Sequence, residues 1–204
     1  MSTAGNNVEQ DIVNAAQDIF VEKGYDGATM REIAARAGIN ISMLHYYFRS
    51  KDNLFDIVSN RVFQRLYGRI FEVMASSEDL FAKLQTIVDL YLQTVSENPR
   101  VPGFILNEVT RRPVGNGRLA DYKRLIHEHA KTFQEQLDRA AREGLIRPVG
   151  VMELFVDIES LCVYPFLTFP LWQKLFDTTQ TDFTRMVLSR RETFAQNLIK
   201  SLEK

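Results

Sequence analysis

The chain has 204 residues, a mass of 23.6 kDa and 45% hydrophobic residues, enough for one compact unit or two small ones with a sizeable core. Its net charge of −1 excludes a global basic field, so a nucleic-acid partner would have to meet a local patch. The single cysteine, Cys162, excludes a disulfide framework within the chain and indicates a reducing, cytoplasmic setting.

Neither a targeting signal nor a membrane span is expected. The first ten residues, MSTAGNNVEQ, do not place a basic stretch before an apolar one, so they do not match a signal peptide. The most apolar run, LCVYPFLTFPLW at residues 161–172, contains two prolines and is too short to span a membrane. A buried, kinked helix end is the better interpretation.

Helical periodicity is present nearly everywhere, and no strand alternation lasts beyond a few residues. The first expected helix begins near Val8, with Asn7 as its N-cap, and ends at Gly24. The sequence TMRE at residues 29–32 forms a capping box for a short second helix, which Gly38 stops.

Asn40 then caps a third helix over residues 41–48, and Ser50 caps a longer fourth helix that starts near Lys51. Helical spacing resumes at residue 80 and lasts until Pro99. Four further helices are expected over residues 103–111, 118–143, 151–168 and 181–202. The sequence therefore predicts an all-α protein of about nine helices.

Two short helices joined by a tight glycine turn, at residues 29–48, are typical of a helix-turn-helix module. Short helices and turns occur in any all-α protein, so the spacing alone leaves both readings open. At about 100° per residue, Ile41, Leu44 and Phe48 share one side of the third helix and supply its core stripe. Polar and aromatic side chains cover the rest: Ser42, Met43 and Tyr46 opposite the stripe, His45 and Tyr47 on its flanks. Such a helix has the make-up of a groove reader.

The surroundings of this helix are locally basic. Between residues 28 and 51 the local charge is +3, from Arg31, Arg36, Arg49 and Lys51 against Glu32. Thr29 and Lys51 lie at helix N-termini, where free N–H groups and the helix dipole favour phosphate oxygens. Each charge alone is typical of a solvated surface, but their cluster around one short exposed helix favours DNA.

Residues 12–55 resemble the DNA-binding domain of the tetracycline-repressor (TetR) family of bacterial transcription regulators. In that family a first helix ending in F-x-x-x-G-Y/F precedes a Thr-capped helix with the core pair I-A. A glycine turn, a recognition helix with L-Y-x-H/Y-F, and a K-D/E-x-L helix opening follow. The anchors present here are Phe20, Gly24, Tyr25, Thr29, Ile33, Ala34, Gly38, Leu44, Tyr47, Phe48, Lys51 and Leu54.

The resemblance implies two domains, a helix-turn-helix DNA-binding domain over residues 1–55 and a ligand-binding and dimerisation domain over residues 56–204. It places Thr29 and Lys51 at positions that usually touch phosphate. It places Arg31, Ile41 and Ser42 at positions that can face bases.

Two residues depart from the family pattern. His45 stands where tyrosine is usual, so a phenol contact is not carried over, although an imidazole can bond a phosphate, more strongly when protonated. Met43 stands where a small hydroxyl residue is common, and an apolar contact to a thymine methyl is a substitute. With Tyr46 and Tyr47 these residues complete the expected DNA-binding face.

Large apolar residues are dense in the C-terminal region. Simple core packing explains any one of them, but an aromatic-rich helical core with a few polar groups is also how small-molecule pockets are lined. The candidate pocket residues are Phe104, Glu108, Tyr122, Phe155, Tyr164, Phe166 and Trp172. Arg111 and Arg112 are further candidates for its polar groups.

The last two long helices are the candidates for homodimerisation. An apolar stripe runs along the final one: Phe183, Val187, Phe194, Leu198 and Leu202. Arg190 falls in register with this stripe. We expect it either to pair with Asp157 or Glu159, within the chain or across a two-fold interface, or to lie along the rim with its head in water.

The sequence therefore predicts a ligand-responsive repressor that binds a palindromic DNA operator as a dimer and is released by a small-molecule inducer. An activator of the same family, and a helical protein–protein interaction module that uses the aromatic helix, stay open as alternatives. No enzyme, catalytic residue, metal or cofactor is expected. His127 and His129 project about 200° apart on a helix, and Cys162 lies in an apolar run typical of an inert thiol.

Overall fold

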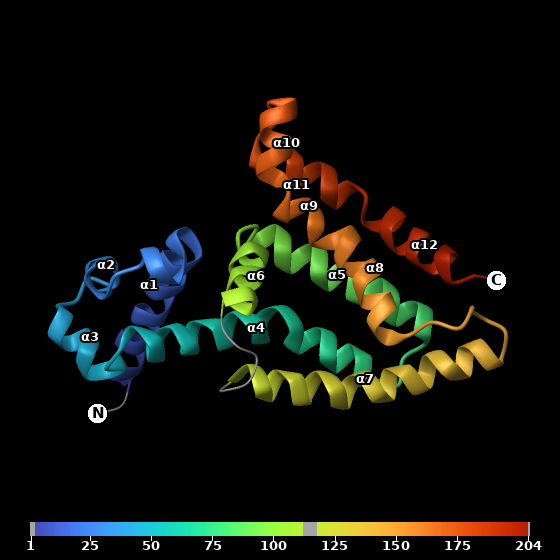
Figure 1. Cartoon of the computed structure of the whole chain (residues 1–204), viewed down its shortest axis with the longest axis horizontal. Coiled ribbons are helices and arrows are strands. Elements are labelled where there is room, and N and C mark those ends of the chain that lie inside the picture. The colour runs from blue at the N-terminus through green and yellow to red at the C-terminus, as the bar shows by residue number, and fades with distance from the viewer. Residues whose placement is uncertain (1–2, 112–117, 204) are drawn as a thin grey trace. The chain divides into compact units, whose positions relative to one another are not determined.

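The structure is a computed structural model of the chain, and it describes residues 3–111 and 118–203. Within these ranges it contains twelve α-helices and no strand (Figure 1), so the all-α prediction is confirmed. The helices are α1 (Thr3–Gly27), α2 (Met30–Arg36), α3 (Ile41–Phe48), α4 (Lys51–Ala75), α5 (Leu80–Glu97), α6 (Val101–Arg111), α7 (Arg118–Arg142), α8 (Val151–Cys162), α9 (Tyr164–Leu167), α10 (Phe169–Phe176), α11 (Gln180–Ser189) and α12 (Arg191–Leu202).

The first helix departs from its expected start. It begins at Thr3, so Asn7 lies inside the helix and the prediction that it is the N-cap is wrong. The expected end at Gly24 agrees better with the structure: α1 continues to Gly27, but Gly24 interrupts its helical geometry with φ 68° and ψ 177°. Glycine accepts a positive φ without a steric penalty, and the chain bends there.

The two long C-terminal helices expected from periodicity are each divided, and a further helix, α10, lies between them where none was expected, so the described residues contain twelve helices instead of nine. After α8, Pro165 and Pro170 occupy the first turns of α9 and α10. A proline has no N–H to contribute to a continuing helix, so it starts a new one readily. The second division falls at Arg190, with φ −95° and ψ 5°, where neither glycine nor proline signals it.

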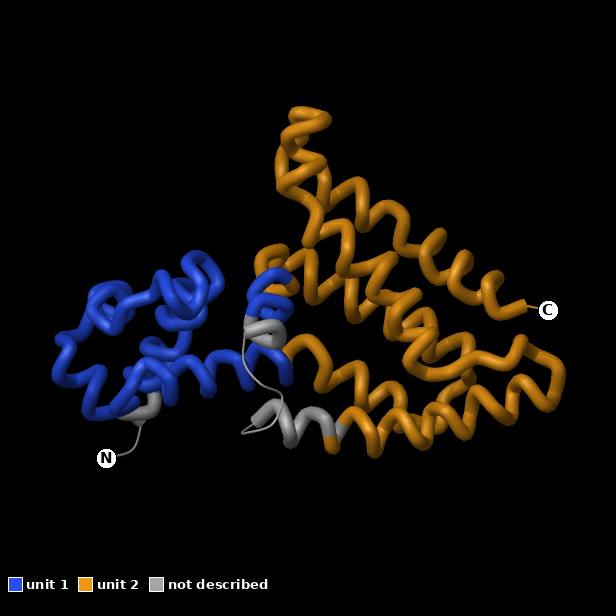
Figure 2. The backbone as a smooth tube through the Cα atoms, viewed as in Figure 1, with its two compact units in different colours: residues 1–64, 103–113 blue, residues 65–102, 114–204 orange. Residues whose placement is uncertain are grey.

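The chain forms two compact units (Figure 2). Unit 1 consists of Met1–Gln64 and Gly103–Pro113. Its core is aromatic: the Phe55 ring lies 4.7 Å from Phe20, 4.9 Å from Tyr25 and 5.6 Å from Phe104, centroid to centroid. This cluster holds α1 against the start of α4 and so supports the short helices between them.

Unit 2 consists of Arg65–Pro102 and Val114–Lys204. Lys83 is the one buried charged residue among those described, and its Nζ donates to the carbonyls of Met74 and Ser76 and to Gln136 Oε1. It thus satisfies carbonyls at the end of α4 that a helix leaves without partners.

A second polar cluster lies between α4, α5 and α8. Glu159 Oε1 accepts hydrogen bonds from the hydroxyls of Tyr67, at 3.3 Å, and Tyr91, at 3.2 Å. Burial, and then the nearby Glu159 charge, raise the pKa of the Tyr67 hydroxyl well above its usual value. Both phenols therefore stay protonated and serve as donors.

The apolar stripe offered for dimerisation packs inside the protein's own unit 2. Every member is buried: Phe183, Val187, Phe194, Leu198 and Leu202. These side chains are not available to a second copy, so their use as a dimer seam is a wrong prediction. Periodicity identified a buried face correctly but could not say which surface covers it.

No helix among the described residues is both long enough and apolar enough to cross a membrane.

Candidate nucleic-acid interface

Local signals build the helix-turn-helix as expected. Gly38, at φ 68°, closes the turn after α2, and the Ile39 N–H donates to the Ala34 carbonyl at 3.0 Å. Asn40 Oδ1 then accepts from the Met43 N–H at 2.8 Å and starts α3. The expected N-cap and the expected bounds of the third helix are confirmed.

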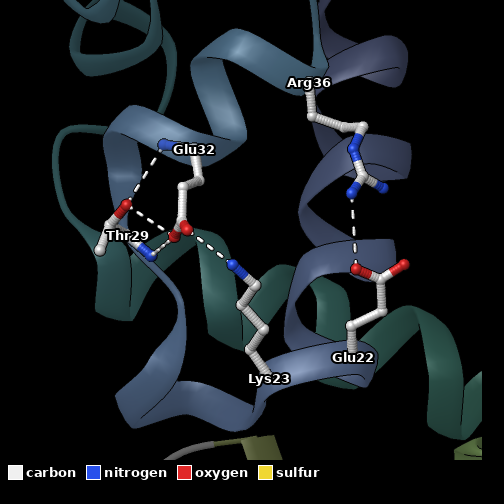
Figure 3. Close-up of polar contacts among 5 residues, drawn as sticks. All are labelled: Glu22, Lys23, Thr29, Glu32 and Arg36. Carbon is white, nitrogen blue, oxygen red and sulfur yellow. Dashed lines mark hydrogen bonds and ion pairs between the residues drawn. The ribbon is translucent and has the colours of Figure 1, made fainter.

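The predicted capping box at the start of α2 is also confirmed, and Lys23 of α1 extends it (Figure 3). Thr29 Oγ1 accepts from the Glu32 N–H at 3.2 Å and donates to Glu32 Oε2 at 2.8 Å. Lys23 Nζ lies 2.6 Å from Glu32 Oε1. The bond from Lys23, followed by that from Thr29, lowers the pKa of Glu32 to about 2.

A second ion pair joins α1 to α2, between Arg36 Nη2 and Glu22 Oε2 at 3.4 Å (Figure 3). Two of the groups in the basic surroundings are thus already engaged within the protein. Thr29 shares its hydroxyl with Glu32, and Arg36 pairs with Glu22. Arg31, in contrast, is exposed and has no carboxylate partner among the described residues.

Helix α3 buries two of its three expected core residues. Leu44 is 0% and Phe48 is 1% exposed, but Ile41 is 39% exposed, so its place in the core stripe is a wrong prediction. As the first residue of α3, Ile41 lies at the edge of the surface that covers the helix. Ser42, Met43 and His45 are exposed, Tyr46 is 81% exposed and Tyr47 is half-buried, as the helical projection indicated.

Contacts that the sequence did not reveal fix the corner between α3 and α4. His45 Nδ1 lies 3.1 Å from the Arg49 carbonyl oxygen. Asn53 Nδ2 donates to the Phe48 carbonyl at 3.1 Å, and its N–H donates to the predicted cap, Ser50 Oγ, at 3.2 Å. The aromatic pattern of the segment gives no sign of these bonds, which depend on side chains meeting carbonyls across the corner.

Lys51 is held in place by the tyrosine that follows Gly24. Its Nζ lies 4.2 Å from the centroid of the Tyr25 ring, and the Tyr25 hydroxyl donates to Asp52 Oδ1 at 2.7 Å. A cation over an aromatic face is stabilised by the ring quadrupole while it keeps part of its surface in water. The ammonium group is therefore positioned at the start of α4, where an anion would also meet backbone N–H groups.

Residues 12–58 match the family model described as bacterial regulatory proteins, tetR family. The chain is 25% identical to the HTH-type transcriptional repressor KstR2 of Rhodococcus jostii over 162 residues, 79% of this chain and 75% of KstR2. Residues 12–58 form a TetR-family domain.

Solved structures share the fold of the chain that contains this TetR-family domain. The ketosteroid transcriptional regulator KstR2 of Mycobacterium tuberculosis matches with a TM-score of 0.70 at 16% identity, over 100% of this chain and 97% of that one. FadR from Bacillus subtilis, in complex with stearoyl-CoA, matches with a TM-score of 0.63 at 15% identity, over 95% and 99%. The chain with this TetR-family domain is a DNA-binding transcriptional regulator, and its relatives are regulators rather than enzymes.

The candidate pocket residues of the chain do not gather in one place. Phe104 belongs to unit 1, Phe155 is half-buried on α8, and Phe166 is buried against Phe183. Tyr164 and Trp172 do come together, on a groove between α9, α10, α11 and α12. The side chains of Glu108, Tyr122 and Arg111, and the whole of Arg112, lie outside the described residues.

Arg190 also lies on this groove. Its guanidinium carbon is 4.8 Å from the centroid of the Phe194 ring, and the side chain is exposed. Glu159 is engaged by two tyrosines of its own unit, so Arg190 does not pair with it within the chain. The geometry agrees with an arginine along the rim; a pair across a two-fold interface stays a prediction.

The two histidines and the cysteine that were weighed for metal binding or catalysis have the surroundings of packing or surface residues. The His129 ring stacks on Phe71 at 5.7 Å, whereas His127 is exposed. Burial, followed by the Asp89 and Glu159 charges, raises the pKa of the Cys162 thiol to about 12. A thiol with so high a pKa carries little thiolate and is a poor nucleophile at neutral pH.

Proposed function

We propose that the protein is a cytoplasmic, ligand-responsive repressor that binds a palindromic operator as a homodimer. The observation that carries this proposal is the division of α3 into a buried side, Leu44 and Phe48, and an exposed side that includes Tyr46. A helix held by only two core residues, with its remaining surface free, can enter the major groove of DNA.

The proposed DNA contacts fall into two groups. Lys51 contacts a phosphate from the position that Tyr25 gives it, and Thr29 contacts one by turning its hydroxyl proton from Glu32 to the phosphate. Arg31, Ile41 and Ser42 face bases. On the rest of α3, Met43 contacts a thymine methyl, while His45, Tyr46 and Tyr47 approach the backbone or base edges.

One short recognition helix covers only a few base pairs, so two copies are required for a specific site. Two-fold symmetry then gives half-sites one helical turn or more apart. In the proposed dimer, the two copies contact each other through the outward faces of the C-terminal helices α8, α9, α11 and α12. Met152 and Val156, at i and i+4 on α8, form an exposed apolar pair that suits such a contact.

A small-molecule inducer completes the proposal. The similar proteins include a ketosteroid transcriptional regulator and a regulator crystallised in complex with stearoyl-CoA, which supports a hydrophobic effector here. The inducer favours a spacing of the two recognition helices that does not fit successive grooves. Because coupling is a shared free energy, operator DNA must weaken inducer binding by the same factor.

Selection of bound DNA from a random pool tests the function. The expected result is an enriched palindrome whose affinity falls steeply as salt rises, because phosphate contacts release counterions. A position of the palindrome that overlaps a promoter supports repression, and one upstream of it supports activation. Absence of any enriched sequence, or binding that salt does not weaken, would contradict a DNA-binding role for α3.

A further inference from the structure

A groove of about 400 Å³ lies within unit 2, between α9, α10, α11 and α12. Its walls include the rings of Tyr164, Trp172, Phe176 and Phe194. Phe176 is 72% exposed and Tyr164 is 58% exposed, so large apolar surfaces face water there. The volume lies in the range of small-molecule sites, and clustered apolar exposure of this kind marks a binding surface.

Charge in the groove is unbalanced. Asp182 is neutralised locally, since Arg185 Nη1 lies 2.9 Å from its Oδ1 and Thr179 Oγ1 donates to its Oδ2 at 2.8 Å. Arg190 forms no ion pair with a carboxylate among the described residues, and its guanidinium carbon lies over the Phe194 ring. One positive charge is therefore left over beside the aromatic walls.

The hydrogen-bonding groups point to the same kind of ligand. Trp172 Nε1 already donates to Thr168 Oγ1 at 2.9 Å, so the indole offers only its apolar surface. The Tyr164 hydroxyl has no partner in the described part of the chain and can donate. The Phe194 ring, whose centroid lies 4.8 Å from the Arg190 guanidinium carbon, accepts no conventional hydrogen bond, so the N–H groups of Arg190 can donate to a ligand.

We propose that this groove binds a hydrophobic monocarboxylate, with the carboxylate on Arg190 and the apolar body across Trp172 and Phe176. A guanidinium binds a carboxylate through two parallel charge-assisted hydrogen bonds, which neither a neutral alcohol nor a cation can form. The ligand would cover the exposed rings. The assignment extends the proposed inducer response by naming a site and a ligand class, but binding itself does not depend on DNA.

Trp172 is the single tryptophan of the chain and lines the groove, so its fluorescence reports binding directly. The full-length protein is titrated with decanoate and with decanol, which has the same chain without the charge. Decanoate is expected to change the emission saturably and to bind at least about tenfold more tightly than decanol, since a hydrogen bond to a charged group is among the stronger ones.

Two arginine variants test whether the guanidinium of Arg190 binds the carboxylate. Arg190→Gln should weaken decanoate binding about tenfold and leave decanol binding unchanged, while Arg139→Gln, an exposed arginine on α7, should change neither. Circular dichroism confirms that both variants are folded. Equal affinity of decanoate for the wild type and Arg190→Gln, or no saturable change in emission, overturns the proposal.

The same measurements distinguish a ligand site from the alternative, in which a second copy of the chain covers the groove. If Phe176→Glu converts a dimer to a monomer in sedimentation and the wild type binds no decanoate, a second copy covers the groove and the proposal fails. Operator binding is measured independently by anisotropy of labelled DNA. If the protein binds decanoate through Arg190 but binds no operator, the ligand site is supported and the proposed regulatory function is contradicted.

Discussion

The imidazole Nδ1 of His45 lies 3.1 Å from the carbonyl oxygen of Arg49. Because a carbonyl oxygen only accepts, the bond requires the ring proton on Nδ1. Arg49 is the centre of a γ-turn, with φ 53° and ψ −50° and with the Ser50 N–H donating to the Phe48 carbonyl. This backbone is strained for a residue with a side chain. The hydrogen bond from His45 therefore stabilises the corner between α3 and α4, which precedes Lys51.

His45→Ala should therefore destabilise unit 1 and weaken operator binding together. Loss of one hydrogen bond costs about 1 kcal/mol of the free energy of unfolding, measured by urea denaturation. The loosened corner should lower operator affinity severalfold, measured by anisotropy. His127→Ala, which removes an exposed histidine on α7, is the matched control. If His45→Ala behaves like the control in both measurements, the corner does not need the imidazole.

The capping box gives a dependence on pH. The folded-state pKa of Glu32 is lowered to about 2, below its usual 4.5, so the carboxylate stabilises the fold above pH 4.5. That contribution declines as the pH falls from 4.5 toward 2. Glu32→Gln should lower the melting temperature at pH 7 and differ little from the wild type near pH 2.

Glu22→Gln is the control for this experiment, because Glu22 has a longer ion pair, to Arg36 at 3.4 Å, and caps no helix. Its effect on the melting temperature should be smaller. A Glu32→Gln deficit that persists unchanged at pH 2 would show that the loss comes from packing rather than from the charge.

Lys83→Met tests the buried cation of unit 2. Methionine fills a similar volume but leaves the carbonyls of Met74 and Ser76 and the Gln136 amide without their donor. The free energy of unfolding should fall by about 2–4 kcal/mol, because buried acceptors lose their partner. Lys131→Met, at an exposed position on α7, should change it by less than about 0.5 kcal/mol in the same urea titration.

Tyr46→Ala and Lys51→Ala test the exposed face of the helix-turn-helix. Each should weaken operator binding about tenfold and leave the oligomeric state unchanged in sedimentation. Lys51→Ala should also reduce the slope of log affinity against log salt by about 1, because one phosphate contact is lost. Tyr46→Phe keeps the ring and separates stacking from hydrogen bonding. Unchanged affinity in both alanine variants would remove this face from the interface.

Much of unit 1 follows from short-range signals. A Thr29–Glu32 box, a glycine at position 38 and Asn40 before a helix each act over six residues or fewer, so they can be recognised without the fold. The burial of Leu44 and Phe48 follows from helical geometry alone. Ile41 does not, because its exposure depends on where the covering surface ends.

The sequence by itself determined an all-α chain with a capped helix-turn-helix and a buried C-terminal stripe, because caps and periodicity act along the chain. Tertiary structure decided which surface covers that stripe, the break at Arg190, and the placing of this arginine beside Phe194 on an aromatic groove. It also decided that His45 bonds the Arg49 carbonyl. These contacts depend on the relative placement of helices and corners, which local propensity does not encode.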